Sequence, residues 1–264
     1  MRTLAIFGIS GHMGQSLLRA LVDDPAWRLT GAIASGGSRG VGRDAGAPSD
    51  ALGVAITADA HAGVRGAAVA LDFSLAAAVS EHARACAAAG VPLVVGTTGL
   101  DAAGRAALQQ ASLRIPVLVA PNTSVGVGVV SKLVSLAAAG LGSSFDAEIT
   151  DSHHRLKRDA PSGTALALGE RIAAARGVEL SSVATYERSG EHAPRRAGSI
   201  GFSAIRAGDI VGEHTVTFAA AGEIVQITHR ATDRIIFARG ALRAAGWLVG
   251  RPAGMYGMED VLGL

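Results

Sequence analysis

The sequence predicts an α/β protein: a parallel sheet in the first half of the chain, followed by an α+β domain with a mixed sheet. Short aliphatic runs alternate with amphipathic stretches of helical spacing up to about residue 122. Hydrophobic residues make up 49% of the 264 residues but aromatic residues only 4%, which favours the tightly packed aliphatic core of layered α/β proteins. The 35 glycines have no collagen-like period and fit many tight turns between strands and helices.

The first half reads as five strands and three helices in alternation. Apolar residues at helical spacing, Met13, Leu17 and Leu21 among them, mark the first helix. Gly90 has the position of a C-cap at the end of another helix. From these patterns we expect helices at 12–24, 75–90 and 101–112 and strands at 2–8, 27–34, 67–74, 91–99 and 115–122.

The regular alternation of strand and helix patterns ends after Asn122, which indicates a second domain. Several β-rich runs joined by glycine turns lie between residues 199 and 231, and they favour a mixed or antiparallel sheet with helices on one face. No flexible linker is visible, so the chain is expected to cross between the domains on ordered segments. We expect a strand at 145–154 and helices at 126–142, from Ser162 onwards and at 234–250.

Charge and cysteine content exclude several classes of protein. The net charge is only +2 and no dense basic block is interleaved with aromatic residues, so no nucleic-acid partner is expected. Cys86 is the only cysteine, lies in a predicted helix and is expected to be a buried, inert thiol. The first residues run straight into a strand, and no apolar run of about 18 residues lacks charges or glycines. We therefore expect a cytoplasmic protein that does not enter a membrane.

The segment GISGHMG, residues 8–14, joins the first strand to the first helix. Glycine permits a tight turn and a close approach of the backbone to a pyrophosphate, and the helix N-terminus supplies free N–H groups. This arrangement is typical of a Rossmann-like dinucleotide-binding domain; a turn needed only for packing is the alternative. The residues expected to bind the cofactor here are Gly8, Ile9, Ser10, Gly11, His12 and Met13.

The end of the second strand bears on which cofactor is bound. An acidic residue there would bind the ribose 2′-hydroxyl of NADH, but Ala34 and Ser35 stand at the candidate positions. Ser35, Ser38 and Arg39 are instead suited to a 2′-phosphate. NADPH is therefore favoured over NADH, with a merely solvated Arg39 as the alternative.

Two further loops follow predicted strands. In open α/β sheets, ligands lie beyond the carboxyl ends of the strands, so both loops are placed to contact the nicotinamide end of the cofactor. Each loop alone is only a turn of small residues, but together with the glycine turn they favour a nucleotide site. The residues concerned are Gly96, Thr97 and Thr98 in one loop and Ala120, Pro121, Asn122 and Thr123 in the other.

The most polar part of the chain is DSHHRLKRDAPSGTALALGE, residues 151–170. Ser162 is a good N-cap, and Gly163 beside it leaves backbone N–H groups accessible, so the helix start is a ready site for a carboxylate or phosphate. The Thr164 hydroxyl offers a further donor. An ordinary capped helix without a ligand is the alternative.

His153, His154 and Lys157 precede this helix. Histidine is the side chain best suited to proton transfer near neutral pH, and Lys157 offers a cation and a proton. A dicarboxylate held by His154, Lys157 and the N–H groups of 162–164, with His153 or Lys157 as proton donor in a hydride transfer, would explain the concentration of charge. Further ligands for a metal ion are not evident, so no metal is expected. A solvated basic loop is the other alternative.

At these residues the sequence resembles the dihydrodipicolinate reductase (4-hydroxy-tetrahydrodipicolinate reductase) family. HHRLKRDAPSGTA matches that family's signature H-H-x-x-K-x-D-x-P-S-G-T-A, which is long and specific. The resemblance extends over essentially the whole chain, through GISGHMG, LDFS, VVGTTG, APNTSVGV, IRAGDIVGEHTV, ITHRA, FARGALRAAGWL and DVLGL.

The resemblance implies a function and roles for individual residues. Members of the family reduce (2S,4S)-4-hydroxy-2,3,4,5-tetrahydrodipicolinate to tetrahydrodipicolinate with NADH or NADPH, in the synthesis of diaminopimelate and lysine. His153 corresponds to the family's proton donor or acceptor and Lys157 to a proton donor. His154 corresponds to a substrate contact, and Gly163 with Thr164 to the backbone that binds a substrate carboxylate.

The resemblance also implies an organisation. Residues 1–123 and 235–264 would form the dinucleotide-binding domain, and 124–234 the substrate-binding and tetramerisation domain of a homotetramer. Closure of the domains is expected to exclude water. His12 stands where many members carry Arg, and Ala34 or Ser35 where many carry an acidic residue, which again favours NADPH.

Two other functions stay open from the residues alone. Another small nicotinamide-dependent amino-acid dehydrogenase would share the glycine turn, but would have no reason to combine His153, His154 and Lys157 with the helix start at 162–164. A redox-sensing nucleotide-binding regulator would need a DNA-binding element, and no helix-turn-helix or basic cluster is visible.

Overall fold

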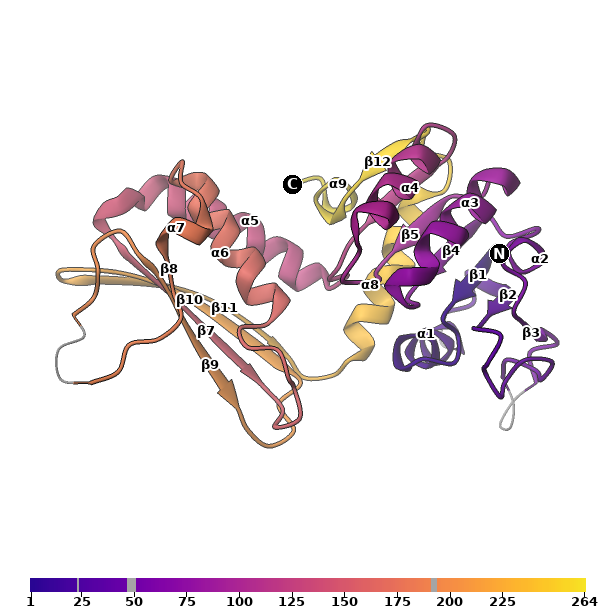
Figure 1. Cartoon of the computed structure of the whole chain (residues 1–264), viewed down its shortest axis with the longest axis horizontal. Helices are drawn as coiled ribbons and strands as arrows, with labels where there is room; N and C mark the ends of the chain where they lie inside the picture. The colour runs from indigo at the N-terminus through magenta and orange to yellow at the C-terminus, as the bar shows by residue number, and fades with distance from the viewer. Residues whose placement is uncertain (23, 47–50, 191–193) are drawn as a thin grey trace. The chain divides into compact units, whose positions relative to one another are not determined.

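The chain folds into two compact units, shown in Figure 1, in a computed structural model that describes residues 1–22, 24–46, 51–190 and 194–264. Unit 1 consists of residues 1–125 and 235–263, so its last part comes from the end of the chain. Unit 2 consists of residues 126–234 together with Leu264.

Unit 1 contains a seven-stranded sheet in which all neighbouring strands are parallel, as predicted. The strand order is β12-β6-β5-β4-β1-β2-β3, so the direction of winding reverses beside β1. Doubly wound sheets bind their ligands at such a point. The strands are β1 (Arg2–Phe7), β2 (Trp27–Ile33), β3 (Ile56–Thr57), β4 (Val69–Asp72), β5 (Leu93–Val95), β6 (Pro116–Val119) and β12 (Gly254–Tyr256).

Helices cover both faces of this sheet (Figure 1). One hydrophobic cluster contains Leu17 of α1 and Leu242 of α8, and another contains Cys86 of α3 and Leu108 of α4. Cys86 is fully buried, and burial raises the pKa of its thiol, as expected of an inert core residue. The helices are α1 (His12–Val22), α2 (Ala60–Gly63), α3 (Val79–Ala89), which follows the 3₁₀ turn η1 (Ala76–Ala78), α4 (Ala102–Ser112), α8 (Ile235–Leu248) and α9 (Met258–Leu262).

Helix ends in unit 1 follow the capping residues of the sequence. Asp101 accepts the Gly104 N–H at 2.7 Å and so begins α4. Gly90 ends α3 in the left-handed conformation, with φ 69°, as predicted from its position.

Unit 2 contains a five-stranded mixed sheet in the order β11-β10-β7-β9-β8. The central strand β7 pairs antiparallel with β10 and parallel with β9, which confirms the predicted mixed sheet. The strands are β7 (Asp146–His153), β8 (Ala184–Thr185), β9 (Ile200–Arg206), β10 (Gly212–Ala220) and β11 (Glu223–Ala231).

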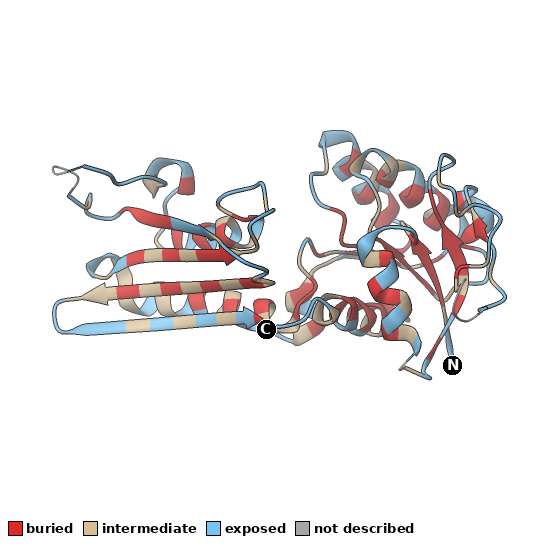
Figure 2. Ribbon diagram, turned by 90° about the horizontal axis from the view of Figure 1, so that it is seen from below, coloured by how far each residue is buried: buried red, intermediate tan, exposed pale blue. Residues whose placement is uncertain are grey.

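Helices cover one face of the sheet in unit 2. Val134 of α5 and Ile172 of α6 share a core with Ile149 and Phe218 of the strands. Within the described residues no helix covers the other face: buried and half-buried residues alternate along β10, and β11 is largely exposed (Figure 2). The helices are α5 (Val125–Leu141), the 3₁₀ turn η2 (Gly142–Ser144), α6 (Gly163–Ala175) and α7 (Leu180–Val183).

The uncovered face of this sheet is polar. The hydroxyls of Thr215 and Thr228 lie 3.0 Å apart across β10 and β11, and Arg230 Nε donates to Glu213 at 2.6 Å. Cross-strand pairs of this kind stabilise a sheet without covering it. The face is therefore compatible with both water and a polar interface.

The segment Val125–Ser144, which contains α5, is long and apolar enough to cross a membrane by length and composition alone, with a mean hydropathy of 1.7. Core helices pass the same test. Val130, Val134 and Ala138 belong to the core of unit 2, and Lys132 interrupts the apolar run. One side of α5 thus packs on the sheet of unit 2, while only 22% of the apolar window is buried.

Candidate active site

Three glycines play different parts in the turn between β1 and α1. A Cβ on Gly8, whose φ is +79°, would lie 2.5 Å from the carbonyl oxygen of Phe73. A Cβ on Gly14 would lie 2.4 Å from the carbonyl oxygen of Gly8, so packing requires both glycines. Gly11 is exposed at the start of α1, where the N–H groups of the first turn have no intrahelical acceptors. The turn thus fits the pyrophosphate of a dinucleotide.

The loops predicted to bind a cofactor lie along one edge of the sheet in unit 1, at the carboxyl ends of β1, β5 and β6. Gly96 N–H donates to the Asp72 carbonyl at 2.9 Å, and Ala120 N–H donates to the Val95 carbonyl at 2.9 Å. The parallel register therefore places each loop beside the next. The structure brings the glycine turn and both loops to the same edge.

Several of the predicted cofactor residues have side chains that are already engaged. The Thr97 hydroxyl donates to Asp72 Oδ1 at 3.0 Å, and the Thr123 hydroxyl donates to the Phe237 carbonyl at 2.7 Å. Both threonines are buried, as are Ile9 and Ala120, so these four offer a ligand mainly their backbone. Ser10, Gly11, His12, Thr98 and Pro121 are exposed, and Gly8, Met13, Gly96 and Asn122 range from half-buried to buried.

A buried polar network that the sequence did not reveal holds these loops. Asp72 is fully buried; its Oδ2 lies 2.8 Å from His82 Nδ1, and its Oδ1 accepts the Ser74 hydroxyl at 2.6 Å and the Thr97 hydroxyl. The His82 ring stacks on Phe7, with centroids 4.0 Å apart. The network joins the loop after β4 to the loop after β5. No local spacing marks it, because its members meet only in the folded sheet.

The loop after β2 carries the residues predicted to select the cofactor. Ser35 and Arg39 are exposed, whereas Ala34 is buried. Asp44 accepts backbone N–H groups at 2.8–3.1 Å from the residues that follow it, Leu52 among them, and these bonds lower the pKa of Asp44. Within the described part of this loop, residues 34–46, the one carboxylate is thus committed to the loop itself.

The start of α6 in unit 2 forms as the sequence predicts. Ser162 is the N-cap, and its hydroxyl accepts the Ala165 N–H at 3.2 Å. Gly163 is exposed and Thr164 half-buried in the first turn, and a Cβ on Gly163 would meet no atom within 4 Å. There is therefore open space beside Gly163 at the helix start, where a carboxylate could approach.

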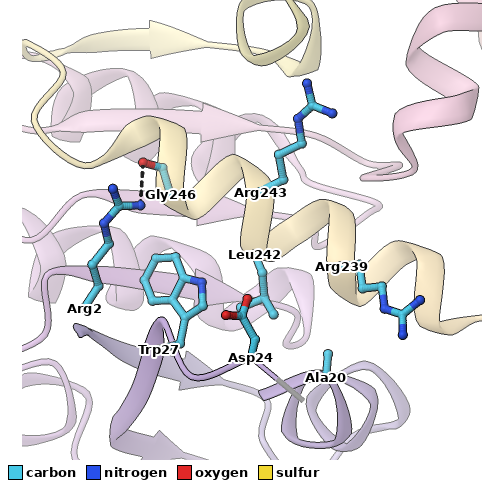
Figure 3. Close-up of a pocket in the computed structure, with 8 residues that line it drawn as sticks. All are labelled: Arg2, Ala20, Asp24, Trp27, Arg239, Leu242, Arg243 and Gly246. Carbon is cyan, nitrogen blue, oxygen red and sulfur yellow. Dashed lines mark hydrogen bonds between the residues drawn. The ribbon is translucent and has the colours of Figure 1, made fainter. Parts of the chain in front are cut away.

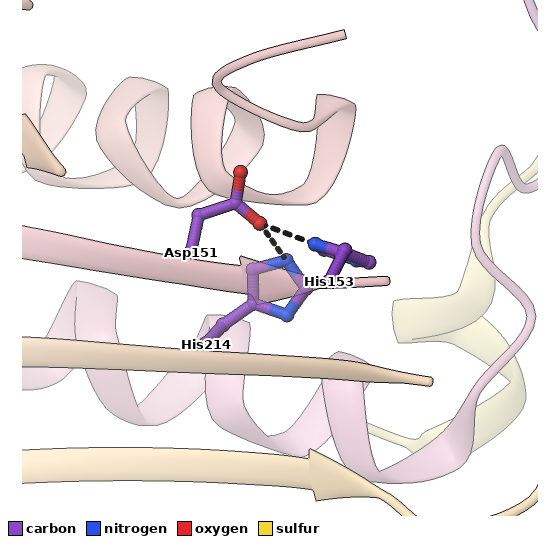
Figure 4. A group of neighbouring side chains, drawn as sticks. All are labelled: Asp151, His153 and His214. Atoms are coloured by element: carbon purple, nitrogen blue, oxygen red, sulfur yellow. Dashed lines mark ion pairs between the residues drawn. The ribbon is translucent and has the colours of Figure 1, made fainter. Parts of the chain in front are cut away.

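A buried carboxylate joins this helix start to the predicted catalytic histidine. Asp151 is 1% exposed, and its Oδ2 accepts the Ser162 backbone N–H at 2.7 Å and Arg206 Nη2 at 2.9 Å. Its Oδ1 lies 2.7 Å from His153 Nδ1 and 3.4 Å from His214 Nε2 (Figure 4). Sequence reasoning gave no role to Asp151, Arg206 or His214.

Burial and charge fix the protonation of this cluster. Burial lowers the pKa of His153 to about 4, although the charge of Asp151 opposes the shift. Burial acts to raise the pKa of Asp151, but the donors around it, His214 first, outweigh burial and hold that pKa well below its usual range. At neutral pH Asp151 is a carboxylate and His153 a neutral imidazole.

His154 and Lys157 lie in the turn that follows β7. Lys157 N–H donates to the His154 carbonyl at 3.1 Å, and Lys157 Nζ lies 2.9 Å from the exposed carboxylate of Asp159. The charge of Lys157 is close enough to lower the pKa of His153. The structure thus brings His153, Lys157 and the start of α6 together within unit 2.

Asp151, His153 and His214 have the spacing of a metal site, since their ligand atoms all lie within 4.8 Å of one another. The carboxylate is already neutralised, because Arg206 and the Ser162 N–H occupy its other oxygen. A divalent ion here would face the Arg206 guanidinium at close range, which is unfavourable. We therefore interpret the cluster as an acid–base network.

A cavity of about 510 Å³ lies at the opposite edge of the sheet in unit 1, where β1 and β2 begin. Arg2, Trp27 and Leu242 line it, together with Arg239 and Arg243 (Figure 3). Arg239 and Arg243 extend from α8 in different directions, so their guanidinium groups do not converge on one point. The cavity is separate from the predicted cofactor loops and is not a convergent anion site.

The fold and the comparisons with known proteins define a class of protein: an NAD(P)H-dependent oxidoreductase with a doubly wound parallel sheet. Models of the family described as dihydrodipicolinate reductase match residues 2–123 (its N-terminus) and 126–262 (its C-terminus). The chain therefore belongs to the dihydrodipicolinate reductase family, which confirms the resemblance seen in the sequence.

Individual relatives agree with this membership. The 4-hydroxy-tetrahydrodipicolinate reductase of Thiobacillus denitrificans is 50% identical over 262 residues, 99% of this chain and 98% of that protein. The reductase of the same name from Alkalilimnicola ehrlichii is 49% identical over 99% of this chain and 98% of its own length. The solved structure of dipicolinate-bound dihydrodipicolinate reductase from Paenisporosarcina sp. TG-14 has the same fold, with a TM-score of 0.76 at 24% identity over 98% of this chain and 99% of that chain.

Proposed function

We propose that the chain reduces (2S,4S)-4-hydroxy-2,3,4,5-tetrahydrodipicolinate to tetrahydrodipicolinate in the synthesis of diaminopimelate and lysine. The substrate loses one water and gains one hydride and one proton, and a bound nicotinamide nucleotide supplies the hydride. The imidazole of His153, the charge of Lys157 close to it and the nearby N-terminus of α6 in unit 2 support this most directly. The relative from Paenisporosarcina binds dipicolinate, a cyclic dicarboxylate of similar shape.

The start of α6 is the proposed carboxylate site. The N–H groups of Gly163 and Thr164 would bind one substrate carboxylate, with Ser162 holding the helix start in place. His154 and Lys157 would contact the rest of the substrate. Lys157 can exchange Asp159 for a substrate carboxylate at little cost, because an exposed ion pair has a net strength of at most about 1 kcal/mol. Together these contacts would hold the substrate in a reactive position.

His153, with Lys157, is the proposed proton donor. The negative charge of Asp151 beside Nδ1 favours the neutral tautomer that carries its proton on Nδ1, and Nε2 is then an acceptor. A neutral His153 must therefore gain a proton before it can donate one. The two negative charges of the bound substrate favour that gain, and the Lys157 ammonium is a cation that can supply or replace the proton.

The cofactor would lie along the loops at the carboxyl edge of the sheet in unit 1. The open start of α1 would bind the pyrophosphate, and the backbone of the loops at 96–98 and 120–123 would border the nicotinamide. The exposed Ser35 and Arg39, and the absence of a free carboxylate within the described residues 34–46, favour the 2′-phosphate of NADPH over NADH.

We also propose an assembly and a location for the protein. The uncovered polar face of the sheet in unit 2 is the proposed contact surface of a homotetramer. As a biosynthetic reductase acting on a small dicarboxylate, the protein would work in the cytoplasm. Analytical ultracentrifugation tests the assembly: a monomer at micromolar concentration contradicts it.

A coupled assay tests the reaction. The substrate is made in situ from pyruvate and aspartate semialdehyde by the preceding synthase, and nicotinamide absorbance is followed with NADPH and NADH separately. We expect rapid oxidation, faster at low concentrations of NADPH. The variants His153→Gln and Lys157→Cys should each lose most of the turnover, whereas Glu179→Gln, an exposed acid in the same unit, should not. Near-full turnover in both folded variants contradicts the assigned roles.

A further inference from the structure

One carboxylate touches both the helix start and the imidazole of the site in unit 2. We propose that Asp151 is the positioning residue of this site, which fixes the orientation of His153 relative to the N-terminus of α6. The inference deepens the proposed function and rests on it for its catalytic consequence. Its geometric part stands independently of turnover.

The two oxygens of Asp151 have separate tasks. Oδ2 accepts the Ser162 N–H at 2.7 Å and Arg206 Nη2 at 2.9 Å, which fixes the rotation of the carboxylate. Oδ1 is thereby directed at His153 Nδ1, 2.7 Å away. The Ser162 N–H belongs to the N-cap residue, directly before the N–H groups of 163 and 164. A shift of the carboxylate would therefore move the imidazole and the carboxylate site relative to each other.

The arrangement leaves the other ring nitrogen of His153 for chemistry. A side chain at position 212 would crowd that nitrogen, because a Cβ on Gly212 would lie 3.1 Å from His153 Nε2. The Nδ1 and Oδ1 atoms lie 2.7 Å apart but do not form a hydrogen bond. The attraction between them is therefore mainly electrostatic, and it strengthens when the ring gains its second proton. Asp151 thus favours the protonated form that a proton donor requires.

The charged and titratable groups around Asp151 come from every neighbouring element. Arg206 is on β9, His214 on β10 and His153 on β7 itself, while Ser162 begins α6. Arg206 also donates to the Asp151 and Asp159 carbonyls at 3.1 and 2.6 Å, so its position does not depend on the carboxylate alone. Removal of the Asp151 charge should leave this frame folded, with an excess of positive charge beside His153.

The first test is the tautomer of His153 in the wild-type protein, read from ¹⁵N chemical shifts and long-range ¹H–¹⁵N couplings of the imidazole at pH 7. The His153→Gln variant assigns the signals. We expect the Nδ1–H tautomer. A predominant Nε2–H tautomer overturns the proposal, because Nδ1 would then carry no proton toward Asp151. The measurement needs no turnover, so it separates a failure of this inference from a failure of the proposed function.

The second test compares Asp151→Asn and Asp151→Glu with the control Glu179→Gln. We expect Asp151→Asn to lower kcat about 10- to 100-fold, with little change in the KM for the cofactor, and to move the alkaline limb of the kcat profile to lower pH, because His153 would lose its proton more readily. Asp151→Glu keeps the negative charge but moves the carboxylate. The pH at which that limb falls should therefore be close to the wild-type value, while kcat should stay lower. An unshifted pH profile in a folded Asp151→Asn variant overturns the positioning role, as does stoichiometric bound metal whose removal abolishes activity.

Discussion

Binding of a dicarboxylate should draw a proton onto His153. In the free protein the pKa of this imidazole is about 4, so at pH 6 only about 1% of the molecules carry the imidazolium. A dianion at the start of α6 brings negative charge close to the ring and favours the protonated form. Ligand binding and proton uptake are therefore linked.

The size of the effect follows from Coulomb's law. At an effective dielectric constant of about 20, a carboxylate about 5 Å from the ring contributes about 3 kcal/mol, which raises its proton affinity more than about 100-fold. From about 1% in the free protein at pH 6, this brings the protonated fraction above about one half, and the second carboxylate raises it further. We expect uptake of about 0.5 to 1 proton per site at pH 6.

Isothermal titration calorimetry with dipicolinate measures this uptake directly. Titrations at pH 6 in buffers of different ionisation enthalpy give the number of protons as the slope of observed enthalpy against ionisation enthalpy. The slope should fall toward zero in His153→Gln and stay unchanged in Glu179→Gln. A zero slope in the wild type with dipicolinate bound, or an unchanged slope in His153→Gln, would refute the reasoning, because the proton would then not belong to His153.

Three further perturbations test other parts of the molecule. Arg39→Ala should raise the KM for NADPH about 10- to 100-fold, because a charged hydrogen bond contributes about 1.5–3 kcal/mol, and should hardly change the KM for NADH. Steady-state kinetics measures both values, with Arg43→Ala, an exposed neighbour, as the control. Gly14→Ala, whose Cβ would lie 2.4 Å from the Gly8 carbonyl oxygen, should weaken cofactor binding and lower Tm, measured by fluorescence titration and calorimetry. The free energy of unfolding should fall as pH drops from 6.5 toward 4, since the unfolded chain protonates His153 while the folded chain does not. The loss is at most about 3 kcal/mol, and urea denaturation of His153→Gln should show a shallower slope in that window.

Most of the fold was accessible from the sequence because its signals are local. The strand–glycine–helix pattern around Gly8 and Gly14, the cap at Ser162 and the stop at Gly90 each depend on residues that are close along the chain. The short elements β3, β12, α2, α7, β8 and α9 were not predicted, since runs of two to five residues carry no clear periodicity. Their existence is decided by pairing with neighbours such as β2 and β6.

The sequence predicted only part of the candidate site: the residues that lie close together along the chain. His153, Lys157 and the start of α6 lie within a dozen residues of one another, so the sequence displays them together. Arg206 and His214 reach the site through the registers of β9 and β10 against β7, which no local pattern specifies. Asp151 is an intermediate case. Residues two apart in a strand share a face, so the predicted strand was enough to place Asp151 on the same face as His153.

The two proton-bearing groups of the proposed site are held in contrasting ways. A buried carboxylate is costly unless it is paired, and Asp151 accepts hydrogen bonds from Ser162 and Arg206 and has the imidazoles of His153 and His214 beside its other oxygen. Such a frame is needed if the orientation of His153 must not vary. Lys157 lies on a turn, with the exposed Asp159 as its partner, and that contact is weak enough for a ligand to replace. A fixed imidazole and a redirectable ammonium suit a reaction in which the proton must arrive along one direction while the substrate's carboxylates are captured from solvent.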